Sequence, residues 1–320
     1  MDERERIAML SRAFATAAPG VLVGIGDDAA VLETPPGARL VWTIDQQVEG
    51  VHFRRELVGW RDIGWRSFMA AASDVAAMAA APWCALSALV LPGDVDDAAL
   101  EELARGQREA AAVVGAPVVG GNLAGGATLS IATTLLGTST APAIERRGAR
   151  AGDGLWMAGR VGLAAAGLRA LERGAGYDAR SRVAVAAWRT PRALIDEGRA
   201  MAGVAHAAVD VSDGLARDVG HLADASGVGV VLDEAALLAD AELVAVAEAL
   251  GESALELALH GGEDYALVAA SDAPIPGFRR IGELRAGAGL ALRGAAGERA
   301  LEPRGYDHFA AVRTGKPPGA

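Results

Sequence analysis

The chain has 320 residues, the length of about two ordinary domains. It carries 30 Lys and Arg against 41 Asp and Glu, so its net charge is −11, and a nucleic-acid backbone or an anionic membrane is a poor partner. Hydrophobic residues make up 52% of the chain, too many for a disordered protein, and the lone Cys84 excludes a disulfide framework and a multi-cysteine metal site.

Short apolar runs alternate with longer alanine-rich segments, which predicts an α/β or α+β fold. In the first half we expect strands at 40–44, 85–91, 118–119 and 128–136, and helices at 62–80 and 97–114. In the second half we expect strands at 155–158, 207–211, 228–232, 265–270 and 280–283, and helices at 163–173, 191–201, 214–225 and 241–250. Pro191 is expected at a first helical position.

A turn-rich passage at 149–154 marks the expected domain boundary. It predicts a first domain of residues 1–148, a second domain of residues 149–313, and a loose Gly- and Pro-rich tail of residues 314–320. The charged start of the chain, Met1 to Arg6, has no apolar core of a signal peptide, and no apolar run reaches about 18 residues. With the single cysteine, these features predict a cytoplasmic location.

Several carboxylates stand at the ends of predicted strands, in Gly-rich turns or, in one case, within a predicted apolar helix. They are Asp28, Asp45, Asp74, Asp210 and Asp213. Any one of them has an ordinary explanation as a helix cap or a solvent-facing residue. Asp74 is harder to explain in this way, because a carboxylate within an apolar helix is costly unless it is paired or bound to a cation. The group therefore favours a site for Mg²⁺ and phosphate, with an ion-pair network as the alternative.

The chain lacks the usual phosphate-binding motifs, because neither G-x-x-x-x-G-K-[ST] nor a dinucleotide G-x-G-x-x-G after a strand occurs. Gly120-Gly121-Asn122, after the strand 118–119, is the better-placed turn for backbone N–H groups to approach a phosphate. An acidic protein without such a lysine must use metal to offset nucleotide charge. The five histidines form no metal pair, no G-x-S-x-G is present, and Cys84 is expected in the core.

Six blocks in order resemble one family, the thiamine-monophosphate kinases of the aminoimidazole-ribonucleotide-synthetase superfamily. The blocks are 24–30, Asp45 with 48–53, 73–78, 209–215, 261–265 and 305–309. The resemblance implies two α/β domains, a homodimer formed through N-terminal strands, and transfer of the γ-phosphoryl group of ATP to thiamine monophosphate. It implies that three groups of residues serve the reaction. Mg²⁺ ligands are Asp28, Thr43, Asp45, Asp74, Asp210 and Asp213; nucleotide contacts are Gly121, Asn122, Arg146 and Ser212; substrate contacts are His52, Glu263 and Tyr306.

The implied chemistry is physically coherent. The acceptor is a phosphate with a second pKa of about 6, so it is largely deprotonated at neutral pH and needs no general base. The remaining work is to align and neutralise two anionic groups, and Asp74 and Asp213, through Mg²⁺, and Arg146 are the residues expected to do it. Glu263 and the ring of Tyr306 suit the cationic thiazolium of the substrate.

Two departures from the family pattern leave alternatives open. Many members have Gly-Asp-Thr-Thr-Arg-Gly where this chain has Gly121 to Gly126, and Asn122 offers an oxygen but no charge. Many also have Ser-Thr-Asp-Thr where this chain has Thr43-Ile44-Asp45-Gln46, so Ile44 lacks a hydroxyl. The alternatives are a catalytically silent nucleotide- or thiamine-phosphate-binding relative and another ATP-using enzyme of the superfamily.

Overall fold

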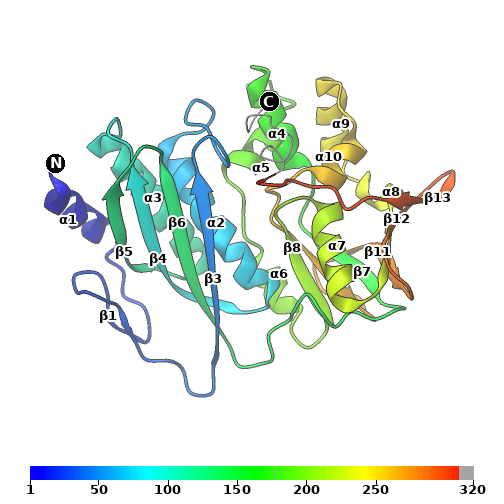
Figure 1. The fold of residues 1–320 in the computed structure, drawn as a ribbon, viewed down its shortest axis with the longest axis horizontal. Helices are drawn as coiled ribbons and strands as arrows, with labels where there is room; N and C mark the ends of the chain where they lie inside the picture. Colours follow the sequence, from blue (N-terminus) through cyan, green and yellow to red (C-terminus); the bar gives the residue numbers. More distant parts are fainter. Residues whose placement is uncertain (177, 310–320) are drawn as a thin grey trace. The chain divides into compact units, whose positions relative to one another are not determined.

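The computed structural model describes residues 1–176 and 178–309. Within them, the chain forms two compact units, one of residues 1–75 and 80–142 and the other of residues 76–79 and 143–309 (Figure 1). The second unit resumes at residue 143, and the predicted boundary between residues 148 and 149 lies in the stretch without helix or strand that follows. The predicted domain limits stay a prediction. The expected tail, 314–320, and residues 310–313 of the expected second domain lie outside the described residues.

The first unit is built on a four-stranded sheet whose strands lie in the order β3-β6-β4-β5. Its elements in chain order are α1 (Glu3–Phe14), β1 (Val21–Val23), β2 (Val31–Leu32), β3 (Arg39–Val48), α2 (Trp60–Ala77), β4 (Ala81–Leu91), α3 (Asp97–Val114), β5 (Val118–Gly125) and β6 (Ser130–Ser139). Strands β4 and β5 run parallel and the other pairs of this sheet run antiparallel, while β1 and β2 form a separate ribbon. This arrangement confirms the expected mixture of helices and strands in the first half.

Helices α2 and α3 cover one face of this sheet (Figure 1). They cross almost backbone to backbone, because a Cβ on Gly64 would lie 2.0 Å from the carbonyl oxygen of Leu103 and a Cβ on Gly106 would lie 1.8 Å from that of Arg61. Only glycine fits at these two positions, so the crossing is fixed by the absence of side chains. The other face of the sheet leaves large apolar side chains exposed. They are Leu40, Trp42, Ile44 and Leu86.

The second unit contains a seven-stranded sheet in the order β13-β12-β9-β11-β7-β10-β8. Its elements are β7 (Gly154–Ala158), α4 (Leu163–Glu172), α5 (Arg182–Arg189), α6 (Ile195–Ala200), β8 (Ala207–Val211), α7 (Leu215–Ser226), β9 (Gly229–Asp233), α8 (Glu234–Leu237), α9 (Ala241–Leu250), α10 (Ala254–His260), β10 (Ala266–Ser271), β11 (Arg279–Arg285), β12 (Leu290–Gly294) and β13 (Gly297–Leu301). Only β12 and β9 pair in parallel among the neighbours described.

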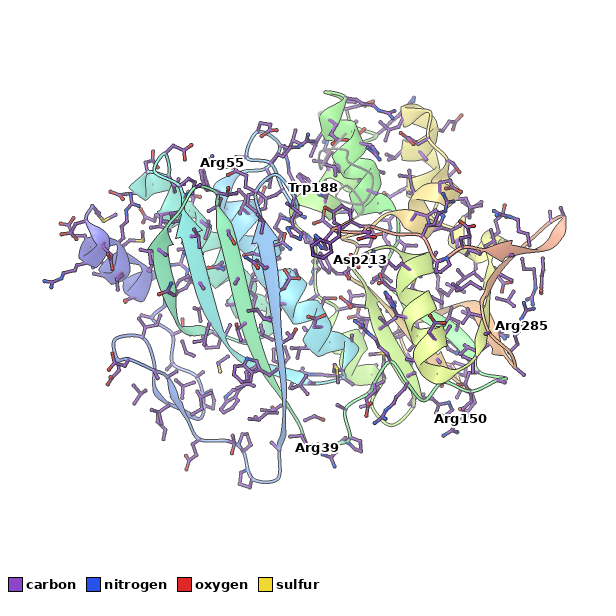
Figure 2. The ribbon with its side chains drawn as sticks, viewed as in Figure 1. Arg39, Arg55, Arg150, Trp188, Asp213 and Arg285 are labelled. Carbon is purple, nitrogen blue, oxygen red and sulfur yellow. The ribbon has the colours of Figure 1, made fainter. Side chains whose placement is uncertain are left out.

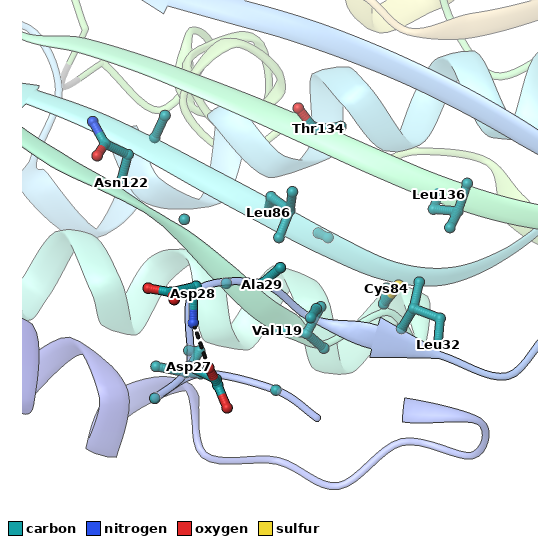
Figure 3. Close-up of a pocket in the computed structure, with 18 of the residues that line it drawn as sticks. Asp27, Asp28, Ala29, Leu32, Cys84, Leu86, Val119, Asn122, Thr134 and Leu136 are labelled. Carbon is teal, nitrogen blue, oxygen red and sulfur yellow. Dashed lines mark hydrogen bonds between the residues drawn. The ribbon is translucent and has the colours of Figure 1, made fainter. Parts of the chain in front are cut away.

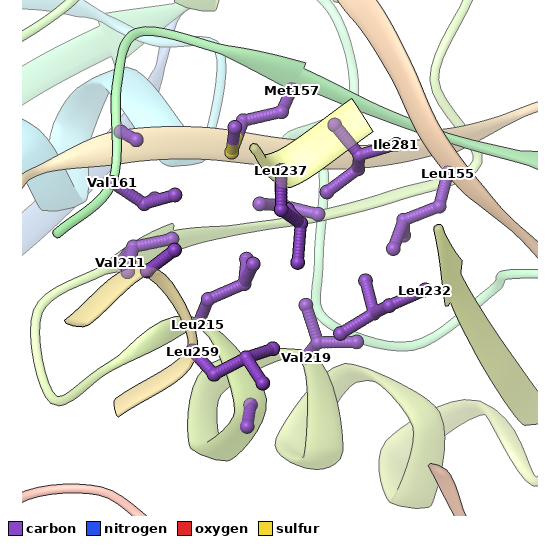
Figure 4. Close-up of a cluster of buried hydrophobic side chains, with 14 of the residues drawn as sticks. Leu155, Met157, Val161, Val211, Leu215, Val219, Leu232, Leu237, Leu259 and Ile281 are labelled. Carbon is purple, nitrogen blue, oxygen red and sulfur yellow. The ribbon is translucent and has the colours of Figure 1, made fainter. Parts of the chain in front are cut away.

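The main core of this unit lies between the sheet and its helices (Figure 4). Leu155, Met157 and Val211 from the strands pack with Leu215 and Val219 from α7. A second cluster packs on the opposite face, where Leu267 and Ala269 of β10 meet Met201. Because β10 alternates between these two clusters, all six of its residues are buried. The strand therefore reads as a continuous apolar run rather than an alternating one.

Several sequence expectations were wrong in detail. Gly120-Gly121-Asn122 does not follow a short strand but lies within β5, which pairs with β4 as far as Gly125. The extra pairing is possible because Gly121 has no side chain, since a Cβ there would lie 1.9 Å from the carbonyl oxygen of Ser87. Pro191 is not helical, and α6 begins only at Ile195. The elements that sequence patterns did not indicate are α1, α5, α8, α10, β1, β2, β12 and β13, most of them short.

Candidate active site

In the first unit, β3 and α2 bring two of the expected metal ligands into contact. Thr43 lies on β3, and its hydroxyl donates a hydrogen bond of 2.6 Å to Oδ2 of Asp74 on α2. Asp74 is half-buried, so the helix carboxylate that the sequence marked as costly has a hydroxyl partner. Asp45 lies two residues beyond Thr43 and points to the same side of β3, because side chains alternate along a strand.

The surroundings of Asp45 are rich in oxygen atoms. Its Oδ1 accepts a hydrogen bond of 3.0 Å from Nε2 of Gln47, and Thr133 lies opposite Asp45 on β6. Oε1 of Gln47 and Oγ1 of Thr133 are buried, and neither has a hydrogen-bond partner within residues 1–176 and 178–309. Buried oxygens without partners beside a carboxylate form a donor set of the kind that hard cations such as Mg²⁺ prefer.

Asp28 lies in the exposed loop between β1 and β2 and lines an open pocket of about 950 Å³ (Figure 3). Gly121 and Asn122 of β5 line the same pocket, and the backbone N–H of Asp28 donates to Oδ1 of Asp27 at 2.8 Å. The expected metal ligand Asp28 and the two expected nucleotide residues of β5 therefore border one space.

His52 lies in the turn after β3. Its Nδ1 accepts a hydrogen bond of 3.0 Å from the backbone N–H of Val48, so in the neutral ring Nε2 carries the proton. Arg146 lies near the start of the second unit with an exposed side chain, and its carbonyl oxygen accepts a hydrogen bond of 3.1 Å from the hydroxyl of Ser226.

In the second unit, the turn between β8 and α7 carries Ser212 and Asp213, and a buried carboxylate holds its backbone. Oδ2 of Asp218 accepts hydrogen bonds from the N–H groups of Ser212, Asp213 and Gly214 at 3.0, 3.0 and 3.2 Å. Burial and, after it, the negative charge of Asp213 raise the pKa of Asp218 to about 6. Asp210, the other expected ligand, is 4% exposed near the end of β8.

The carbonyl oxygens of the same turn bind two of the three expected substrate residues. The N–H of Glu263 donates to the carbonyl of Ser212 at 2.7 Å, and the N–H of Tyr306 donates to the carbonyl of Asp213 at 2.9 Å. Expected nucleotide, metal and substrate residues of the second unit therefore form one backbone-linked cluster.

The segment Gly261–Tyr265 has an unusual backbone. Glu263 and Tyr265 have φ values of 64° and 50°, in the left-handed region that residues other than glycine rarely adopt. Between them, Asp264 accepts hydrogen bonds from the N–H groups of Gly162 and Ala164 at 2.6 and 3.0 Å, at the start of α4. Burial raises the pKa of Asp264 to about 7. Asp264 thus anchors the strained segment to a helix about 100 residues earlier in the chain.

The side chain of Glu263 also has an unexpected partner. Nε1 of Trp188, on α5, donates a hydrogen bond of 2.8 Å to Oε2 of Glu263. Burial, and then the negative charges of Glu263 and Asp213, raise the pKa of Tyr306. Glu263 therefore joins the indole of Trp188 to the turn that binds Tyr306; Figure 2 labels Trp188 and Asp213.

The structure thus brings Thr43 together with Asp74 in the first unit, and Ser212 and Asp213 together with Glu263 and Tyr306 in the second. Among the residues it describes, no three His, Cys, Asp or Glu side chains are grouped closely enough to hold a metal alone. Asp218, Asp264 and Trp188 were missed by sequence reasoning. Asp218 could have been noticed as an acidic residue in the first turn of the predicted helix 214–225, and Asp264 as part of the block 261–265. Trp188 has no such local signal.

Comparison with known proteins defines the class first. The family model "AIR synthase related protein, N-terminal domain" matches residues 26–139, and "AIR synthase related protein, C-terminal domain" matches residues 150–294. The fold is therefore the two-domain α/β fold of AIR-synthase-related proteins, as the motif blocks implied.

The relatives then define the family. The thiamine-monophosphate kinase of Mycobacterium tuberculosis (strain ATCC 25618 / H37Rv) is 37% identical over 82% of this chain and 79% of its own length. That of Aquifex aeolicus (strain VF5) is 33% identical over 89% and 92%. A solved structure described as AaThiL complexed with AMPPCP and TMP has a TM-score of 0.80 at 30% identity, covering 96% of this chain and 97% of its own. The chain belongs to the thiamine-monophosphate kinase family.

Proposed function

We propose that this protein transfers the γ-phosphoryl group of ATP to thiamine monophosphate, forming thiamine diphosphate and ADP as a step of thiamine diphosphate biosynthesis. The observation that carries the proposal is the similarity, over 96% of the chain, to a relative described as a complex with AMPPCP and TMP. The hydrogen bonds that join Ser212 and Asp213 to Glu263 and Tyr306 support it, because they place residues expected for both substrates in one cluster.

The reaction requires that the two phosphate groups be aligned and their negative charge compensated, and it does not require a general base. The acceptor phosphate of thiamine monophosphate is largely deprotonated at neutral pH, since its second pKa is about 6. Gly121, Asn122, Arg146 and Ser212 would contact the nucleotide. The exposed guanidinium of Arg146 would offset negative charge on the phosphates during transfer.

We also propose that Mg²⁺ is required. The residues fit it, because every donor in the set is a hard oxygen and unpartnered buried oxygens lie beside Asp45. The proposed ligands in the first unit are Thr43, Asp45 and Asp74, together with Asp28, which lines the pocket on the opposite face of the sheet beside Trp42 and Ile44. The proposed ligands in the second unit are Asp210 and Asp213, and Asp74 and Asp213 are the two that we propose as catalytically decisive. When bound, the metal supplies compensation for the charge on the phosphoryl oxygens.

Recognition of the thiamine ring would fall to His52, Glu263 and Tyr306. Nε2 of His52 carries a proton in the neutral ring and can donate a hydrogen bond, since Nδ1 is an acceptor. Glu263 and the face of Tyr306 suit the positive charge of the thiazolium.

We further propose that the protein is a homodimer. The face of the four-stranded sheet not covered by α2 and α3 exposes Trp42 by 72%, Ile44 by 65% and Leu40 by 50%. A contiguous apolar face of this kind is characteristic of a protein interface, and a second copy would cover it. Trp42→Asp should shift the protein to monomers in analytical ultracentrifugation, whereas Val113→Asp, at an apolar position on α3 that is 58% exposed, should leave the dimer unchanged.

A cytoplasmic location is part of the proposal. Across the described part of the chain, no helix combines the length and apolarity needed to cross a membrane.

The test of the function is a product assay. Purified protein with ATP, Mg²⁺ and thiamine monophosphate should form thiamine diphosphate and ADP in equal amounts, and EDTA should stop the reaction. ATP binding without product would favour the silent relative, and ADP formation without thiamine diphosphate would favour another acceptor. In either case Asn122→Asp, which restores the family's charge in β5, is the variant to make next.

A further inference from the structure

Trp188 is placed to act on substrate recognition without touching the substrate. It is 1% exposed, so almost none of its surface is available to a ligand. Its indole N–H donates to Oε2 of Glu263 at 2.8 Å. An indole nitrogen can donate a hydrogen bond but cannot accept one, so Oε2 of Glu263 must be the acceptor.

The helix that carries Trp188 is itself held closely. On α4, a Cβ added to Gly167 would lie 2.0 Å from the carbonyl oxygen of Ala184 on α5, so the two helices meet with no side chain between them at this point. Trp188 follows Ala184 by four residues and lies on the same side of α5. The donor therefore stands on a fixed element rather than on a loop.

Glu263 is held at its backbone as well. Its φ of 64° is in the left-handed region, and its N–H donates to Ser212 at 2.7 Å. With Trp188 at the far end of the side chain, both ends of Glu263 are constrained. One carboxylate oxygen is engaged by the indole, and the orientation of the other is set by it.

The environment suits a cation. Tyr306 is 44% exposed, and its N–H donates to the carbonyl of Asp213 in the turn that also binds Glu263. A carboxylate of fixed orientation and a partly exposed aromatic ring, linked through the backbone of one turn, suit a flat cationic ring.

We infer that Trp188 is a positioning residue for substrate specificity, whose N–H holds Glu263 in the orientation that binds the cationic thiamine ring. The inference rests on the proposed function. Pre-orientation avoids the entropy of ordering a flexible Glu side chain during binding. Loss of the indole N–H should therefore weaken use of thiamine monophosphate and leave use of ATP unchanged.

The experiment uses Trp188→Phe, which keeps an aromatic ring but has no donor. We expect kcat/KM for thiamine monophosphate to fall about tenfold, as for loss of a hydrogen bond to a charged group, and the KM for ATP to change less than twofold. Trp156→Phe is the matched control, because Trp156 also donates its indole N–H in the second unit, to the carbonyl of Ser271 at 3.2 Å. The control should change neither value.

A double-mutant cycle separates positioning from a structural role. In a Glu263→Ala background, Trp188→Phe should cause no further loss, because the residue through which it acts is gone. The inference would be overturned if Trp188→Phe lowered kcat/KM equally in the wild-type and Glu263→Ala proteins. It would also be overturned if the variant lowered kcat/KM equally for both substrates, or did not lower it at all. If Trp188→Phe does not fold, Trp188→His, which keeps a ring N–H, replaces it in the experiment. Its kcat/KM for thiamine monophosphate should then be higher than that of Glu263→Ala.

The proposed function can fail separately. If the wild-type protein forms no thiamine diphosphate, the function is wrong. Calorimetric binding of thiamine monophosphate to wild type and Trp188→Phe then decides the inference alone, with about tenfold weaker binding supporting it and equal or no binding overturning it.

Discussion

The two units hold their candidate site residues in different ways. In the first unit, Thr43 and Asp74 stand on a strand and a helix, and a hydrogen bond between their side chains joins them. In the second, Asp213 and Glu263 stand on loops, and the backbone of those loops is tied by buried carboxylates and carbonyl oxygens. Regular elements position a side chain through their own hydrogen bonds, whereas a loop needs anchors. Residues remote from the chemistry therefore matter more in the second unit.

The largest expected effect tests the chemistry of the first unit. Asp74→Asn removes a charge at nearly constant volume, and kcat should fall by roughly a thousandfold, as for loss of a key electrostatic group. The unfolding midpoint should stay within a few degrees, because α2 does not depend on this side chain. Asp62→Asn makes the same change in the same helix and should keep most of the activity. Near-normal turnover of Asp74→Asn would exclude Asp74 as a metal ligand.

Asp218→Ala should reveal the dependence of the second unit on its anchors. Three N–H groups, one buried and two partly buried, lose their acceptor, so the free energy of unfolding should fall by about 3 kcal/mol. The value of kcat should fall about tenfold because Asp213 is no longer held. Urea unfolding and steady-state kinetics measure the two losses. Asp218→Asn retains an acceptor oxygen and should lie between wild type and Asp218→Ala. Loss of activity without loss of stability would contradict the anchoring role.

The anchors should also give this unit a dependence on pH. The pKa of Asp264, raised to about 7 by burial, lies above its ordinary value of 3.8. Between these values the folded protein holds a proton that the unfolded chain has released. This group's contribution to stability is therefore greatest below about pH 4 and falls as the pH rises to 7. Urea unfolding at pH 5 and pH 7 should show a decrease on the order of 2 kcal/mol from this group, absent in Asp264→Asn. The same slope in both proteins would assign it to other groups.

The smallest effects compare two threonines of the first unit. Thr43→Val removes the hydroxyl that donates to Asp74 and should cost about 1 kcal/mol of stability. Thr133→Val removes a buried hydroxyl that has no partner within the described residues, so without metal its stability should be unchanged or slightly higher. Chemical unfolding in EDTA makes the comparison. Equal costs for the two changes would mean that the bond between Thr43 and Asp74 contributes nothing.

Local patterns predicted the elements that carry their own signals. Helix α3 has an acidic first turn and a glycine after its last residue, and the sequence located both of its ends. Strand β8 was likewise located as a short apolar run before a turn. Asp74 stood out because a carboxylate in an apolar helix needs a partner. The ordered motif blocks predicted the family, which the comparisons confirm, and the roles of the individual site residues stay predictions.

The anchors could not be predicted in this way. Asp264 binds N–H groups about 100 residues away, and Trp188 lies 75 residues before Glu263. No local sequence pattern indicates that two such distant residues are partners, and α5 is only eight residues long and has no side-chain cap. The extension of β5 depended on contact with Ser87, which only the folded sheet supplies.

The close crossing of α2 and α3 fixes the point about which α2 could rotate. Gly64 and Gly106 lie at this crossing. Asp74 lies ten residues beyond Gly64, about 15 Å along the helix at 1.5 Å per residue. A rotation of about 4° about the crossing would move the Asp74 carboxylate by about 1 Å, a displacement that phosphoryl transfer does not tolerate. Gly106→Ala would therefore displace Asp74 and should lower turnover, although Gly106 lies on a different helix from Asp74.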